Sequence, residues 1–466
     1  MTTTTFDMPW HDSKRWAWLL SPALPVLALA TIGLYFVTGY SVFLWGGPIL
    51  LYVVIPVFDW LVGTDEANPP ESAVGDLEDD RYYRSIVYAY IPAQYLLTVL
   101  GAWMVATQGL SPLQIMGLLM TVGTINGVGI NTAHELGHKT NGLERWLAKI
   151  TLAPVAYGHF FVEHNRGHHK NVATPEDPAS SRMGESFWAF LPRTAIGSLR
   201  SAWGIERERL ARLGKGVWSV ENENLQAFAM TVVLFGGLAL VLGPVVLPFL
   251  ILQAAFGAAL LEVVNYLEHY GLKRRKMDSG RFERCQPEHS WNSNHTVTNL
   301  FLYQLQRHSD HHAHPTRRYQ ALRHFEQSPQ LPSGYASMIL LAYFTPLWFR
   351  VMDPKVVAHY QGDLSRINMH EPARKRLEQR WGTAPTPTTL LHDDAADLAP
   401  IQASAAVTDW QCPNCDHVYR EAAGEPRFGF APGTSWSQIP DDFSCPDCSV
   451  RDKADFVPLE PSERAA

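Results

Sequence analysis

The chain has 466 residues, of which 46% are hydrophobic and 18% charged, which excludes a disordered or fibrous protein and leaves room for two or three domains. Five cysteines are too few for a disulfide scaffold, and a net charge of −7 gives no basic footprint for nucleic acid. The mean hydropathy of −0.10 averages an apolar N-terminal half with a polar C-terminal third, so each segment is considered by itself.

Six stretches are apolar over the ~20 residues that a helix needs to cross a bilayer. They lie at residues 17–37, 42–63, 86–106, 112–133, 226–243 and 244–267. The first lacks a small-residue cleavage site after it, which predicts a retained helix and not a removed signal peptide. These features predict an all-α integral membrane protein with six transmembrane helices.

The orientation of these helices follows from the basic residues between them. Lys and Arg gather in the loops 64–85 and 134–225 and in the run that follows the sixth stretch, whereas the other connections have none. By the positive-inside rule, both termini lie on the cytoplasmic side. We therefore expect a multi-pass protein of the inner membrane of a bacterium.

Nine of the nineteen histidines fall into four short motifs at the predicted cytoplasmic ends of the spans. The motifs are HELGHK, EHNRGHH, NYLEHYG and QRHSDHH, and three of them have histidines three or four residues apart, which places their rings on one helix face. The nine are His134, His138, His164, His168, His169, His269, His308, His311 and His312. A lone histidine is usually packed or solvated, but clusters at this spacing favour metal binding.

Nine imidazoles suggest two metal ions, because a metal ion in a protein takes about four to six ligands. Nitrogen-rich sites with open positions suit iron or another late transition metal. HELGH by itself is the zinc-protease signature HExxH, in which Glu135 would be the general base, but that interpretation leaves seven histidines without a role. Glu135 and His138 also form half of a carboxylate di-iron motif, yet these clusters contain no second ExxH.

Residues 383–408 are rich in Ala, Pro, Thr and Asp without periodicity, which predicts a flexible linker between a membrane domain at 1–382 and a small domain at 409–460. The small domain has two Cys-Pro-x-Cys pairs, and four thiolates so paired make a tetrahedral zinc or iron site. They are Cys412, Cys415, Cys445 and Cys448.

With Tyr419, Trp436 and the segment 439–443 between the pairs, residues 409–460 resemble rubredoxin over its whole short length. The resemblance implies a small one-iron, iron–sulfur electron carrier, and a structural zinc ribbon is the alternative. Asp416 and Ser449 stand where rubredoxins usually have glycine, at turns that favour positive φ. Both departures leave the four ligands intact.

The four histidine motifs in this order, with NPPE at 68–71, make residues from about 15 to 380 similar to the membrane-bound alkane 1-monooxygenases. The resemblance implies a cytoplasmic non-haem di-iron site whose ligands are the nine histidines. It also implies terminal hydroxylation of an n-alkane by O2, with two electrons delivered through rubredoxin from a rubredoxin reductase. Here the carrier is fused to the enzyme.

Physical reasoning agrees with this function. An n-alkane partitions into lipid, so a site at the end of a helix bundle can take its substrate from the bilayer while electrons arrive from water. Attack on an unstrained methyl group requires a redox-active metal, which zinc is not. Terminal selectivity requires a narrow apolar tunnel that admits the chain end-on.

Several other side chains are candidates for supporting roles. Acidic residues next to the ligand histidines can accept the second ring N–H and fix its orientation, which nominates Glu135, Glu163, Glu268 and Asp310. Glu262 lies within the sixth span, where a carboxylate suggests function. Trp60, in the second span, is a candidate for limiting substrate length in the tunnel, although aromatic residues in such a span more often face lipid or another helix.

Three alternatives remain open from the sequence. A fatty-acyl or lipid desaturase or hydroxylase of the same membrane di-iron superfamily would use similar histidine clusters, although the fused rubredoxin argues against it. An intramembrane zinc protease and a metal carrier without catalytic activity are the others. About three irons per chain with a rubredoxin-like visible spectrum would favour the oxygenase, and one zinc without colour would favour the protease.

Overall fold

The computed structural model describes residues 10–277, 280, 282–382, 409–413, 417–440, 443, 445–448, 451 and 453–459. The predicted linker 383–408 lies outside the described residues. Seventeen α-helical segments and a three-stranded sheet are found in the described part of the chain. The chain is therefore mostly helical, as the sequence predicted.

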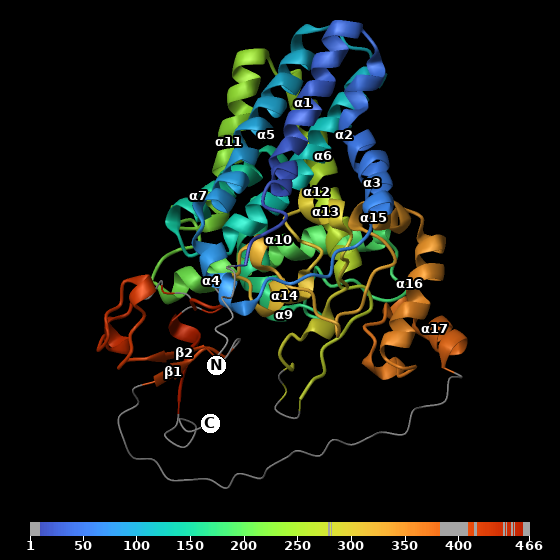
Figure 1. The fold of residues 1–466 in the computed structure, drawn as a ribbon. Coiled ribbons are helices and arrows are strands. Elements are labelled where there is room, and N and C mark those ends of the chain that lie inside the picture. The colour runs from blue at the N-terminus through green and yellow to red at the C-terminus, as the bar shows by residue number, and fades with distance from the viewer. Residues whose placement is uncertain are drawn as a thin grey trace, which may run out of the picture.

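Six helical segments among the described residues are long and apolar enough to cross a membrane, and their positions confirm the six predicted spans. They run from Ala17 to Thr38, Ser41 to Val62, Arg81 to Thr107, Pro112 to Gly137, Glu223 to Leu242 and Val246 to Glu268. The corresponding helices are α1 (Leu20–Thr38), α2 (Gly46–Ile49) with α3 (Ile55–Val62), α5 (Arg81–Thr107), α6 (Pro112–Gly137), α11 (Glu223–Leu242) and α12 (Val246–Glu268). They run side by side in the upper half of Figure 1.

The centre of this bundle is the pair α6 and α12, and small residues let the two helices approach closely. A Cβ atom at Gly127 would lie 2.8 Å from the carbonyl oxygen of Gly257, and one at Gly123 would lie 2.8 Å from that of Gln253. Close packing through glycine is typical of membrane helices. This contact fixes the relative position of the two helix ends that carry His134, His138 and His269.

The other helices lie mostly below the spans (Figure 1). They are α4 (Glu71–Asp79), α7 (Gly142–Leu152), α8 (Phe160–Val162), α9 (His169–Asn171), α10 (Phe187–Arg212), α13 (Thr296–Phe301), α14 (His308–Ala313), α15 (Tyr335–Tyr343), α16 (Thr345–His359) and α17 (Arg374–Trp381). Arg307, just before α14, is buried and donates hydrogen bonds to the carbonyls of Asp65, Ala67 and Leu322. Its guanidinium thus ties α14 to the loop that follows the second span.

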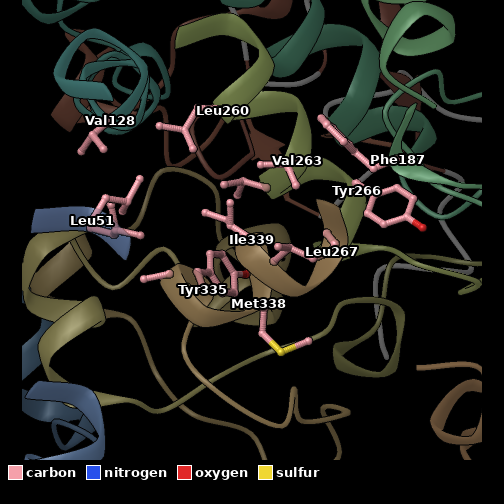
Figure 2. Packing of buried hydrophobic residues seen from close by; sticks show 14 of the residues in the cluster. Leu51, Val128, Phe187, Leu260, Val263, Tyr266, Leu267, Tyr335, Met338 and Ile339 are labelled. Atoms are coloured by element: carbon pink, nitrogen blue, oxygen red, sulfur yellow. The ribbon is translucent and has the colours of Figure 1, made fainter. Parts of the chain in front are cut away.

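A buried hydrophobic core joins the two layers. Figure 2 shows part of this core, with Leu260 and Tyr266 of α12 and Tyr335, Met338 and Ile339 of α15 packed together. Burial of such side chains removes apolar surface from solvent and stabilises the fold.

The C-terminal residues form a sheet in the order β2-β1-β3, from β1 (Asp409–Gln411), β2 (Val418–Arg420) and β3 (Val457–Pro458), and both pairings are antiparallel. An aromatic core lies against it, in which Trp410 and Trp436 stack with ring centroids 5.1 Å apart. Three closely placed cysteines, Cys412, Cys445 and Cys448, are part of the same core.

Candidate metal centre

The nine predicted histidines meet in one buried region and divide into two groups. One group has five members, His134, His138, His164, His169 and His311, and is called the five-histidine group below. The other has four members, His168, His269, His308 and His312, and is called the four-histidine group. Within each group the ring nitrogens that face inward lie within 4.8 Å of one another.

The two groups adjoin each other. The rings of His169 and His312, one from each group, have centroids 4.4 Å apart. Those of His308 and His311 are 5.7 Å apart. The geometry is that of two neighbouring sites inside one protein core.

In the five-histidine group the Nε2 atoms point at one another. The Nε2 atom of His311 lies 2.8 Å from that of His134 and 3.0 Å from that of His169. The Nε2 atom of His164 lies 3.1 Å from those of both His138 and His169. The four-histidine group repeats this arrangement, because the Nε2 atom of His308 lies 3.0 Å from that of His312 and 3.2 Å from that of His269.

A π-helical turn at Glu163–His168 assigns the histidines of EHNRGHH to their groups. The backbone N–H of His169 bonds to the carbonyl of His164, five residues earlier, so these two rings share a face. His168 points to the other group. The sequence predicts ordinary helical spacing here, and the π turn explains why His164 and His169, which share a group, are five residues apart.

Ordinary helical spacing applies to the other two motifs. His134 and His138, at the end of α6, are four residues apart and belong to the same group. On α14, His308 and His312 are also four apart and share the four-histidine group, while His311 between them turns to the five-histidine group.

Two partners fix the ring orientation in the four-histidine group. Asp177 accepts a hydrogen bond from Nδ1 of His168 at 2.9 Å, and Asp177 is itself held by the hydroxyl of Ser180 at 2.6 Å and the backbone N–H of Ala179 at 2.9 Å. Nδ1 of His269 bonds the carbonyl of His289 at 3.1 Å. A neutral ring that donates from Nδ1 presents an Nε2 lone pair on its other side, so both rings aim an acceptor into the group.

The protonation state of the rings also suits a metal. Burial lowers the pKa of six group members outside the membrane spans, and neighbouring rings lower it further. These are His138, His164, His169, His308, His311 and His312. They are therefore neutral near pH 7, and neutral imidazole is the form that binds metals.

These observations test whether the residues fit metal ions. Neutral rings have one N–H each, so a set of inward-facing Nε2 atoms about 3 Å apart places lone pairs against one another unless a cation lies among them. The Nε2 atom of His168 is buried and has no hydrogen-bond partner within the described residues. All-nitrogen donor sets of four and five suit iron among the common metals. The histidine groups suit a di-iron site.

The acidic residues next to the histidines have more varied roles than the sequence analysis expected. Glu135 lies 3.1 Å from Nζ of Lys139, and Asp310 accepts hydrogen bonds from His314 and Arg317, so each has a charged partner outside the two groups. Glu163 is buried. Glu135 and Asp310 were expected to accept a hydrogen bond from the second N–H of a ligand histidine. Glu135 instead pairs with Lys139, and Asp310 with His314 and Arg317.

Glu268 and Glu262 differ from this pattern. Glu268 Oε2 lies 3.3 Å from Nε2 of His308. This Nε2 atom faces the other rings of the four-histidine group, whereas a supporting carboxylate was expected at the Nδ1 atom on the outer side of the ring. Glu262 accepts hydrogen bonds from Tyr157, Thr194 and Asn265 at 2.6 to 3.2 Å, which connects α12 to α10 through Thr194 and to the loop that contains Tyr157. Glu268 therefore does not take the expected position behind a ligand ring, and the contacts of Glu262 agree with the alternative that it bonds a neighbouring helix.

Asp177 and the carbonyl of His289 were not predicted from the sequence as partners of the ligand rings. The only available signal for Asp177 was an acidic residue nine positions after His168, which is not specific. A backbone carbonyl gives no signal in a sequence.

An enclosed apolar space lies between the spans above the histidines. It is narrow, because only about 40 Å³ of it admits a water-sized sphere. Figure 2 shows four residues of its wall, Leu51, Val128, Leu260 and Ile339. The complete wall consists of Leu24, Leu51, Ile55, Gly127, Val128, Asn131, Leu260, Leu261, Val264, Thr298, Phe301, Leu302, Leu305, Ala336 and Ile339.

The wall of this space includes residues close in sequence to the metal centre, because Asn131 is three residues before His134 and Val264 is five residues before His269. The amide of Asn131 donates to the carbonyl of Leu302 at 2.6 Å, so this polar wall residue has a partner. Trp60 is not part of the wall and is 81% exposed on α3. This exposure favours the alternative that Trp60 faces lipid or another helix over a place in the wall of a tunnel.

The C-terminal domain brings Cys412, Cys445 and Cys448 together as a third group of possible metal ligands. The Sγ atoms of Cys412 and Cys448 lie 3.7 Å apart, and all three side chains are buried. Cys415, Asp416 and Ser449 lie outside the described residues. A buried set of thiolates suits iron or zinc.

Two family models match this chain: fatty acid desaturase over residues 110–342 and rubredoxin over residues 409–456. Curated relatives include an alkane 1-monooxygenase of Acinetobacter baylyi, 48% identical over 80% of this chain and 92% of that protein. An alkane 1-monooxygenase of Pseudomonas putida is 50% identical over 79% and 92%. The hydroxylase component of a xylene/toluene monooxygenase from Pseudomonas putida is 28% identical over 52% and 64%.

Proposed function

This chain belongs to the alkane 1-monooxygenase family, and from that premise we propose that it converts n-alkanes to primary alcohols with O2 and two electrons supplied through its own C-terminal domain. The observation that carries the proposal is the pair of all-histidine groups, together with a narrow apolar space whose wall includes Asn131 and Val264, close in sequence to two of these histidines. The rubredoxin domain implies iron, and the histidine groups suit two further iron ions.

The five-histidine group would hold one iron and the four-histidine group the other. Bound there, the two ions would activate O2 for attack on a C–H bond. The protein contributes the orientation of the rings, through Asp177 and the carbonyl of His289, and burial that keeps the rings neutral. In the C-terminal domain, Cys412, Cys415, Cys445 and Cys448 would hold the third iron.

The apolar space accounts for selectivity toward the chain end. An alkane offers no polar group for recognition, so only shape can position it. A narrow space between α6 and α12 that leads to the histidines admits a linear chain end-on and presents its terminal carbon to the metal centre. Its wall also keeps water from the reacting carbon, because the few polar groups in it have partners, as Asn131 does.

The chain is a membrane protein with several apolar spans. We place it in the inner membrane of a bacterium, with both termini, the histidine groups and the rubredoxin domain on the cytoplasmic side. The distribution of Lys and Arg supports this orientation. A rubredoxin reductase in the cytoplasm would then supply electrons to the C-terminal domain.

The zinc-protease alternative for HELGH has less support. His134 and His138 each share a group with three further histidines, and Glu135 is ion-paired with Lys139. A general base has to be available to activate water, and the pairing with Lys139 occupies this carboxylate.

Two measurements on the purified full-length chain test the proposal. Metal analysis is expected to give about three irons and no stoichiometric zinc per chain. Incubation with an alkane series, O2, reductant and reductase, followed by product analysis, is expected to give 1-alkanols. Desaturated or internally hydroxylated products would contradict the proposal, as would a single bound zinc.

A further inference from the structure

The C-terminal domain contacts the membrane domain at Thr316. The hydroxyl of Thr316 donates a hydrogen bond to the backbone carbonyl of Asp447 at 2.9 Å. Asp447 directly precedes Cys448, which belongs to the cysteine group. A second contact joins Arg212 and Asp455, whose charged atoms are 4.0 Å apart. Thr316 therefore touches the peptide next to a ligand of the carrier.

From Thr316 and the next residue, Arg317, contacts lead to the five-histidine group by two routes. Nζ of Lys139 donates to the carbonyls of Thr316 and Arg317 at 3.0 and 3.1 Å, and Lys139 directly follows His138. The guanidinium of Arg317 donates to both carboxylate oxygens of Asp310 at 3.0 and 3.1 Å, and Asp310 directly precedes His311. Both histidines at the ends of these routes belong to the five-histidine group.

A cleft of about 890 Å³ between the two domains supports the same orientation. Trp410 and Trp436 of the carrier line one side, and Thr140, two residues after His138, lines the other. The end of α6 that carries the histidines thus faces the carrier.

The charges of the two surfaces are complementary. Residues 409–459 contain nine acidic and four basic side chains. The wall of the cleft on the membrane domain has five basic side chains, including Arg145 and Arg212, and two acidic ones. Attraction between opposite charges orients such partners as they approach.

We propose that Thr316 and Arg317 are the docking point of the carrier domain, and that electrons pass there to the five-histidine group before the four-histidine group. This inference rests on the proposed function, in which the carrier supplies the electrons. In the first transfer the ferrous carrier iron would become ferric and the ferric iron of the five-histidine group would become ferrous. That electron would pass to the iron of the four-histidine group, and the carrier, reduced again by the reductase, would make a second transfer to the five-histidine group. Two such transfers provide the two electrons of a turnover, and no covalent bond forms or breaks.

The test uses the full-length chain and three variants. Thr316→Ala removes the hydroxyl and Thr316→Ser retains it. As a control, Thr107→Ala removes an exposed threonine hydroxyl at the C-terminal end of α5, which does not contact the carrier. Each protein is reduced anaerobically with dithionite and mixed with O2 and an alkane. The visible absorbance of the carrier then reports how fast its iron is reoxidised.

We expect Thr316→Ala to slow carrier reoxidation by about fivefold, the change that follows from losing one hydrogen bond in the docked state. Thr316→Ser and Thr107→Ala are expected to keep the original rate. Alcohol formed in the first turnover should be the same in all four proteins, since that turnover uses electrons already at the histidine site. An unchanged reoxidation rate in Thr316→Ala would overturn the docking point.

A second measurement tests the order of reduction. Mössbauer spectra of the iron-57 protein, frozen soon after a single electron transfer from the carrier, are expected to show ferrous iron first in the five-histidine site. Ferrous iron appearing first in the four-histidine site would overturn the order. A chain that forms no alcohol even in the first turnover would contradict the proposed function and not the docking point, so the two failures can be distinguished.

Discussion

Asp177 and the carbonyl of His289 determine which nitrogen of His168 and His269 faces the four-histidine group. Asp177 is buried and receives two further hydrogen bonds, so its carboxylate is held in one position. A partner of this kind fixes the tautomer of a ligand ring and raises its basicity. The orientation of these two rings is therefore built into the protein before a metal binds.

Asp177→Asn is expected to weaken iron binding in the four-histidine group by about 10- to 100-fold, because the amide no longer fixes the N–H on Nδ1 of His168. Iron retained per chain, measured during titration with a chelator, checks this. Asp363→Asn is the matched control, because Asp363 caps a short turn by bonding Ser365 and contacts neither group. Equal iron retention by both variants would show that Asp177 does not position His168.

His138→Ala and His312→Ala each remove one ring, the first from the five-histidine group and the second from the four-histidine group. We expect each to lose iron from its own group and to lower hydroxylation by orders of magnitude. His314→Ala serves as the control, because His314 is half exposed and bonds Asp310 outside both groups. Iron analysis and product quantification measure the outcome, and full iron and activity in either group variant would refute its assignment as a ligand.

The nine histidines could be predicted from the sequence because their motifs have the spacing of helical metal ligands. Their division into five and four could not, since it depends on a π turn at Glu163–His168 and on the way α14 brings His311, but not His308 or His312, to His134. The supporting acids were predicted from adjacency in sequence. Glu135 and Asp310 show why that fails: adjacent side chains on a helix point in different directions, and each found a charged partner elsewhere.

At the scale of the helices, the spans could be predicted because a bilayer sets the length of an apolar helix. The apolar space could not, since it depends on which helix faces meet. Leu51 and Trp60 both lie in the second span, yet the first is buried at the wall of this space and the second is exposed. Both residues are hydrophobic, so the sequence predicts the same membrane location for each. Only the packed structure shows which one faces the apolar space.

Val128→Phe is expected to shorten the longest alkane that the enzyme accepts. Val128 lies six residues before His134 on α6, or about 9 Å along the helix, so a phenyl ring there would fill the space at a distance from the metal centre. Short alkanes would still fit below it. Each methylene in an apolar pocket is worth about 1–3 kcal/mol of discrimination, so the chain-length profile should show a sharp upper limit.

Product yields across an alkane series measure this profile. Trp60→Ser is the matched control, because it changes a large aromatic residue that is exposed and outside the wall, and its profile should equal that of the original chain. A changed profile for Trp60→Ser with an unchanged one for Val128→Phe would place the substrate outside the apolar space.

At the scale of the whole molecule, the fusion places a carrier and its acceptor in one chain. The 26 residues at 383–408 are predicted from their composition to be a linker, and a random coil of that length spans roughly 30 Å. Such a tether gives a millimolar effective concentration of carrier near its docking point. A single weak contact such as that of Thr316 with Asp447 is then sufficient for frequent docking.

Cutting the linker at an inserted protease site should therefore make turnover depend on protein concentration. After cleavage and dilution to micromolar protein, the concentration of carrier around its acceptor would be about a thousandfold lower than the effective concentration in the uncut chain. Alcohol formation per enzyme should fall accordingly, and added C-terminal domain should restore it. The uncut protein with the same insertion is the control. If the cleaved membrane domain, freed of its carrier by gel filtration, still turns over at the original rate with reductase alone, the C-terminal domain is not the obligatory electron donor.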